Sequence, residues 1–143
     1  MSAKETTQIL AKVPLFRGLS KRQIQGLAQT ATQRKYAAGE QIITQGESGI
    51  GLYVILSGEA DAIHTRADGE EVVVNTFGLT DFFGELAMLS DEPRTASVVA
   101  TEDTECLVLT RWEFLGKLKA DAEMSVLILQ ELAKRFQRAL GVL

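Results

Sequence analysis

The sequence predicts a mixed α+β fold that is mainly β, with a roll or barrel of short strands and helices at both ends. Two observations support this class. Between residues 33 and 109, short alternating or apolar stretches are separated by turn signals about every 8 to 12 residues, which is typical of a roll or barrel. Near each end of the chain the apolar residues instead recur every three or four positions, which indicates amphipathic helices.

Size and composition fit one ordinary globular domain over residues 1–143, with 45% hydrophobic and 24% charged residues. The net charge of −4 argues against direct binding to nucleic acid. A single cysteine allows no intrachain disulfide. There is neither a signal-peptide pattern nor an apolar run of about 18 residues, so we expect no membrane span and a cytoplasmic location.

The N-terminal helices are expected at about residues 5–31. Residues 1–4 should form a loose tail, and a short helix should follow over 5–12. A packed turn at 13–19 contains a proline and a glycine. Ser20 and Gln23 have the spacing of a capping box, and the helix over about 21–31 gathers four apolar residues on one face. These residues are Ile24, Leu27, Ala28 and Ala31.

The β-roll is expected at about residues 33–110. The glycine-rich loop over 45–51 requires unusual backbone angles, and Asp68-Gly69 is a hairpin signal. The segment over 78–82 is expected only to lead from the strand over 70–77 into the stretch around Gly84. The predicted strands cover residues 33–36, 41–44, 52–56, 59–65, 70–77, 95–100 and 104–109.

Two C-terminal helices are expected at about residues 111–141. Thr110 and Glu113 form a second capping box, which opens a helix to about residue 119. The last helix, over about 122–140, has apolar residues every four positions. We interpret this stripe mainly as core, although it also permits self-association through a helix pair. It consists of Met124, Ile128, Leu132, Phe136 and Leu140, with Leu127 and Leu129 beside it.

Residues 82–97 combine features that suit a small phosphorylated ligand. Gly84 leaves the backbone uncovered, and the helix predicted from Glu85 to Leu89 would point free N–H groups at a phosphate. Glu85 at that start repels phosphate but accepts a hydrogen bond from a hydroxyl group. After a turn that ends at Pro93, Arg94 supplies a guanidinium fork that matches phosphate oxygens. The segment therefore predicts a ligand with both a phosphate and a hydroxyl.

The run Gly84-Glu85-Leu86-Ala87, followed by Arg94-Thr95-Ala96, resembles the phosphate-binding cassette of cyclic nucleotide-binding domains. The helix–roll–helix order is similar to that family over roughly residues 10–140. The resemblance implies an eight-stranded antiparallel, jelly-roll-like β-roll that binds cyclic AMP or cyclic GMP. It implies that Glu85 binds the ribose 2′-hydroxyl, that Arg94 binds the cyclic phosphate, and that backbone amides of Gly84, Glu85 and Ala87 surround the ligand.

The resemblance also bears on the base. Thr95 is compatible with both ligands in this family, and cyclic AMP is the commoner one. The family caps the base with a residue in or near the last helix, for which Leu132, Phe136 and Leu140 are candidates. Two positions differ from the family pattern: Thr80 stands where Gly is frequent, and Ile50 stands where Asp is common.

The expected function is that of a non-enzymatic regulatory sensor. Its ligand is expected to close the C-terminal helix, and its partner is expected to be an effector protein or domain. No cofactor, metal or catalytic group is expected besides the cyclic nucleotide. One histidine, His64, cannot supply the usual metal-ligand set, and we interpret it as structural. Cys106 in an apolar strand is expected to be a buried, inert thiol. The alternative is a ligand-unresponsive β-roll that serves as an interaction or dimerisation module.

Overall fold

The computed structural model describes residues 1–141 and divides into two compact units. One unit is Thr32–Arg111. The other combines Met1–Ala31 with the C-terminal segment that starts at Trp112. No helix of residues 1–141 is long and apolar enough to cross a lipid bilayer.

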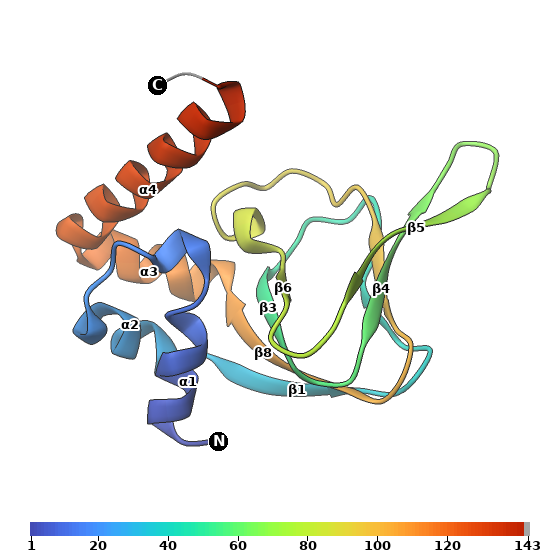
Figure 1. Cartoon of the computed structure of the whole chain (residues 1–143), viewed down its shortest axis with the longest axis horizontal. Coiled ribbons are helices and arrows are strands. Elements are labelled where there is room, and N and C mark those ends of the chain that lie inside the picture. The colour runs from blue at the N-terminus through green and yellow to red at the C-terminus, as the bar shows by residue number, and fades with distance from the viewer. Residues whose placement is uncertain (142–143) are drawn as a thin grey trace. The chain divides into compact units, whose positions relative to one another are not determined.

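Within residues 1–141, eight strands form two four-stranded antiparallel sheets, both in the unit Thr32–Arg111 (Figure 1). One sheet has the order β1-β8-β3-β6 and the other β2-β7-β4-β5. This confirms the predicted mixed α+β fold with an antiparallel β-roll. The strands are β1 (Thr32–Tyr36), β2 (Gln41–Ile43), β3 (Gly51–Ser57), β4 (Ala60–Thr65), β5 (Glu71–Phe77), β6 (Phe82–Phe83), β7 (Ser97–Ala100) and β8 (Thr104–Thr110).

Two strands differ from the sequence prediction by more than one residue at an end. The short strand β6 lies in what the sequence marked as a lead-in, because Phe82 and Phe83 pair with Val54 and Tyr53 of β3. Strand β7 begins at Ser97 rather than at position 95. The last two cassette residues, Thr95 and Ala96, therefore lie outside regular strand pairing.

The interior of the roll is an apolar cluster to which both sheets contribute. The rings of Tyr53 and Phe83 stack with their centroids 5.1 Å apart, and Phe77 lies 4.9 Å from Phe83. Ile50, one of the positions that differ from the family pattern, packs against this cluster. The buried members of the cluster are Ile43, Tyr53, Ile55, Ala60, Ala62, Phe83, Val98, Cys106 and Val108.

The helical unit contains α1 (Ala3–Leu10), the 3₁₀ helix η1 (Pro14–Phe16), α2 (Lys21–Ala28), α3 (Arg111–Ala120, whose first residue belongs to the roll unit) and α4 (Ala122–Leu140). The capping box of Ser20 and Gln23 is confirmed. The expected loose tail is wrong, because the Ser2 hydroxyl accepts a hydrogen bond from the Glu5 amide and α1 begins at Ala3. Helix α2 ends at Ala28, three residues earlier than predicted.

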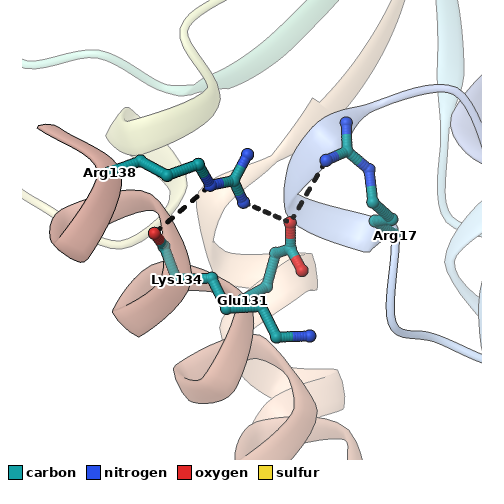
Figure 2. A network of polar contacts seen from close by, with 4 residues as sticks. All are labelled: Arg17, Glu131, Lys134 and Arg138. Atoms are coloured by element: carbon teal, nitrogen blue, oxygen red, sulfur yellow. Dashed lines mark hydrogen bonds and ion pairs between the residues drawn. The ribbon is translucent and has the colours of Figure 1, made fainter. Parts of the chain in front are cut away.

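A buried carboxylate joins the two chain segments of this unit (Figure 2). The Glu131 side chain on α4 is 4% exposed, and its Oε1 lies 3.7 Å from Nη1 of Arg17, directly after η1. The same oxygen lies 3.9 Å from Nη2 of Arg138. The N-terminal and C-terminal segments are thus connected by charge as well as by packing.

Candidate cyclic nucleotide-binding site

The backbone of Arg94 is fixed by the glycine-rich loop that precedes β3. Its amide donates to the Glu47 carbonyl at 2.9 Å, and its carbonyl accepts from the Gly46 amide at 2.8 Å. Ser48 forms an antiparallel bridge with Pro93. The glycine-rich loop therefore holds the cassette arginine in place, and Gly46, with a left-handed φ of +86°, has one of the unusual backbone angles that were predicted for this loop.

The Arg94 guanidinium packs closely against backbone. Its Nη2 donates to the Gly51 carbonyl at 3.2 Å. A Cβ atom on Gly49 would overlap the guanidinium, and one on Gly84 would lie 2.8 Å from Nη2. Glycine at both positions lets the side chain lie against the main chain, so the direction of the guanidinium is defined before any ligand binds.

The charge of Arg94 has no carboxylate partner among residues 1–141. None of the ion pairs in that range includes it, and its Nε is buried without a hydrogen-bond partner. Burial lowers the pKa of Arg94, while the nearby Tyr53 phenol acts in the opposite direction. A partly desolvated guanidinium with unused donors favours binding of an anion, because an anion supplies both the missing charge and the missing acceptors.

The cassette helix is shorter than the sequence predicted. Gly84 adopts a left-handed φ of +81° and is followed by the 3₁₀ helix η2 (Glu85–Met88), in place of an α-helix through Leu89. The Ala87 amide donates to the Gly84 carbonyl at 3.1 Å, which closes the turn. Because one 3₁₀ turn has only a small dipole, Arg94 attracts an anion more strongly than the start of η2 does.

The other predicted cassette residues differ in exposure. Glu85 and Ala87 are buried at 6% and 8% exposure, whereas Leu86 is 55% exposed. Thr95 is exposed. Ala96 is partly buried and packs against the interior cluster of the roll. The structure brings the Gly84 and Arg94 ends of the motif close together.

His64 was missed as a site residue. Its Nδ1 lies 2.7 Å from the Thr95 carbonyl oxygen, so a histidine that the sequence marked only as structural contacts the cassette. The available signal was the alternation along β4, which places His64 on the same face as the buried Ala60 and Ala62. The sequence predicts only a loop at Gly49 and Gly51, and their spacing does not indicate that both contact the Arg94 side chain.

The candidate base-capping residues all lie on α4. Leu132 is partly buried, whereas Phe136 and Leu140 are 65% and 60% exposed. Their assignment to the base stays a prediction. Within residues 1–141 no group of three or more histidine, cysteine, aspartate and glutamate side chains is arranged to hold a metal ion.

Comparison with known proteins identifies the family. The family model described as "Cyclic nucleotide-binding domain" matches residues 33–121, which is more than half of the chain. The chain belongs to the cyclic nucleotide-binding domain family. The match includes every strand except the first residue of β1, and the whole cassette. The matched family is a regulatory binding domain.

Individual relatives agree with this assignment. The chain is 32% identical over 126 residues to the cyclic AMP receptor protein of Thermus thermophilus, covering 88% of this chain and 58% of the relative. It is 38% identical over 109 residues to a cAMP-dependent protein kinase regulatory subunit of Mycosarcoma maydis, covering 74% of this chain and 21% of the relative. The chain therefore spans less than two thirds of the length of these relatives.

A solved structure confirms the fold. The N-terminal domain of a transcriptional regulator from Streptomyces coelicolor A3(2) matches with a TM-score of 0.83 at 27% identity. The match covers 92% of this chain and 94% of that domain, and it extends the similarity beyond the residues of the family model.

Proposed function

We propose that this chain binds a 3′,5′-cyclic nucleotide, with cyclic AMP preferred and cyclic GMP accepted, and acts as a regulatory sensor. The observation that supports it most strongly is the half-buried Arg94 guanidinium, which lies against Gly49 and Gly84 without a carboxylate partner in residues 1–141. The cyclic phosphate would occupy the anion position beside Arg94. Glu85 would accept a hydrogen bond from the ribose 2′-hydroxyl, which would discriminate against 2′-deoxy ligands.

The names of two relatives favour cyclic AMP, because one is a cyclic AMP receptor protein and the other regulates a cAMP-dependent kinase. Thr95 is compatible with either nucleotide. We further propose that residues 1–143 work as one domain, that the output is an effector protein or domain, and that no cofactor is required besides the ligand.

The closing step is proposed for α4. Ligand would favour a state in which one of Leu132, Phe136 and Leu140 covers the base, and it would shift the equilibrium only by binding that state more tightly. Amide hydrogen exchange along α4 should then slow on addition of cyclic AMP. Unchanged exchange at saturating ligand would contradict closure without contradicting binding.

Replacing Arg94 tests the binding site. Arg94→Ala should weaken cyclic AMP binding by about tenfold to a hundredfold, because a charge-assisted hydrogen bond contributes roughly 1.5–3 kcal/mol. The affinity of Arg94→Lys for cyclic AMP should lie between those of the parent and Arg94→Ala, since lysine keeps the charge but lacks the guanidinium fork. Calorimetric titration with cyclic AMP, cyclic GMP and 5′-AMP measures this. Equal affinity of the parent and Arg94→Ala would refute the assignment.

A second candidate function, a dimerisation module that no longer responds to ligand, is favoured by the exposed apolar residues of α4. Val126, Leu129, Phe136 and Leu140 are each at least half exposed on a surface helix. Absence of calorimetric heat with both cyclic nucleotides, together with an unchanged melting temperature, would favour this candidate over the sensor.

A further inference from the structure

Beyond its pairing with β7, the end of strand β4 is bonded to a side chain of the glycine-rich loop. The pairing of β4 with β7 ends at Ile63 and Ser97. Beyond it, the side-chain amide of Gln45 donates to the Thr65 carbonyl at 2.9 Å and accepts from the Thr65 amide at 2.8 Å. The last residue of β4, Thr65, is therefore bonded to the same loop that holds Arg94.

His64 lies in this stretch and is partly buried. Along β4 the buried Ala60 and Ala62 lie opposite Ala100 and Val98 of β7. His64 is the next residue in that alternation. Its Nδ1 lies 2.7 Å from the carbonyl oxygen of Thr95, the residue that follows Arg94 and precedes β7.

The hydrogen bond defines which ring nitrogen bears the proton. A carbonyl oxygen only accepts hydrogen bonds, so Nδ1 of His64 must be the donor. Among residues 1–141 no other group forms a hydrogen bond to this ring. Within residues 1–141 the His64 ring thus has one hydrogen bond, and its partner is the peptide unit of the cassette that joins Thr95 to Ala96.

We propose that His64 is a positioning residue for the ligand site: its Nδ1–H group holds the Thr95 carbonyl, and so fixes Thr95, the cassette residue after Arg94, in the orientation that binds a cyclic nucleotide. This inference rests on the proposed function. Without the hydrogen bond, the segment between the Arg94–Gly46 pair and the start of β7 gains conformational freedom that ligand binding must remove.

Two substitutions separate positioning from general structure. His64→Leu removes the donor and keeps an apolar side chain of moderate size. His64→Asn keeps an N–H donor on the same atom position, because its amide nitrogen is bonded to Cγ as Nδ1 is. A matched control is Thr76→Val, which removes the 2.8 Å hydrogen bond between Thr76 and Asp61 on the same sheet, away from the cassette.

Calorimetric titration with cyclic AMP, together with melting temperatures of the free proteins, gives the readout. We expect His64→Leu to weaken binding by about threefold to tenfold, which corresponds to one neutral hydrogen bond. His64→Asn and Thr76→Val should stay within about twofold of the parent. A parent-like affinity of His64→Leu, or equal weakening in His64→Asn and His64→Leu, would overturn the positioning role.

A nitrogen-15 NMR measurement of the single histidine at neutral pH adds a readout that does not depend on ligand. It should show the proton on Nδ1 of the free protein, and a neutral ring protonated on Nε2 would overturn the inference. If the parent protein binds no cyclic nucleotide, the proposed function and this inference both fail. If the parent binds and His64→Leu binds equally well, only this inference fails.

Discussion

Thr80 adopts a backbone conformation that β-branched residues rarely occupy. Its φ is +68°, and among residues 1–141 it is the one non-glycine residue with positive φ. The turn is held there because the Thr80 amide donates to Ile55 at 2.9 Å and the Gly78 amide donates to the Asp81 carboxylate at 2.8 Å. The family frequently has glycine at this position, where a left-handed φ costs it nothing.

Thr80→Gly should therefore stabilise the protein. We expect the free energy of unfolding to rise by about 1 kcal/mol, since relief of strain outweighs the greater entropy of glycine in the unfolded chain. Urea denaturation measures the change. Leu79→Gly is the matched control, because Leu79 is 67% exposed and lacks the positive φ, and it should instead lower stability. A loss of stability in Thr80→Gly would contradict this account.

Cys106 makes stability depend on alkaline pH. The side chain is fully buried, and burial, aided by the negative charge of Glu105, raises its pKa to about 11 from an ordinary value of 9.0. The folded state thus retains the thiol proton over a range in which the unfolded state releases it. The contribution of the thiol to the free energy of unfolding is constant below pH 9. It is lost as the pH rises from 9 to 11, at up to about 1.4 kcal/mol per pH unit.

Unfolding titrations at pH 8, 9 and 10 in the parent and in Cys106→Ala test this effect. The decline of stability above pH 9 should be shallower in the variant. Some decline should remain in the variant above pH 10, because burial also raises the pKa of Tyr53 to about 12, so the unfolded state releases that proton first. Identical slopes between pH 9 and 10 in both proteins would show that the thiol does not contribute.

At the scale of elements, the apolar stripe of α4 shows why a spacing of four does not define one helix face. Each step of four residues advances about 400°, or 40° beyond a full turn, so Met124 and Leu140 lie about 160° apart around the axis. The structure follows this drift. Met124 and Ile128 are buried, Leu132 is partly buried, and Phe136 and Leu140 are exposed. The prediction that the stripe is core is confirmed only for its first half.

Glu131 on α4 has a carboxylate Oε1 without a hydrogen-bond partner, and two exposed arginines, Arg17 and Arg138, lie near it. Each single change, Arg17→Gln or Arg138→Gln, should lower the free energy of unfolding by only about 0.5–1 kcal/mol, because these arginine side chains are 60% exposed. The double variant should cost more than the sum, roughly 2–4 kcal/mol, since it leaves a buried charge without either cation.

Chemical denaturation of the two single variants and the double variant measures this coupling. Lys134→Gln is the matched control on the same helix, because within residues 1–141 only its carbonyl enters the network, through Arg138. It should change stability by less than about 0.5 kcal/mol. Strict additivity of the two arginine substitutions would refute the shared-carboxylate account.

At the scale of the whole molecule, the exposed face of α4 is the best candidate for self-association. Successive intervals of three, seven and four residues, which are typical of a coiled-coil seam, keep four exposed apolar residues on one side of the helix: Val126, Leu129, Phe136 and Leu140. We expect a concentration-dependent dimer in equilibrium sedimentation. Leu129→Glu combined with Phe136→Glu should abolish it, whereas Gln130→Glu on another face should not. A parent protein that sediments as a monomer at high concentration would exclude this dimer.

The sequence by itself determined the fold class, most strands and helices, and the cassette, because alternation, capping boxes and the spacing from Glu85 to Arg94 are local patterns. Tertiary structure alone decided three further features. Strand β6 exists because Phe82 and Phe83 find partners on β3. The guanidinium of Arg94 is placed by Gly49 and Gly51, and His64 reaches Thr95, across contacts between segments far apart in the chain. Such contacts depend on how strands pair in space, and residue spacing does not encode them.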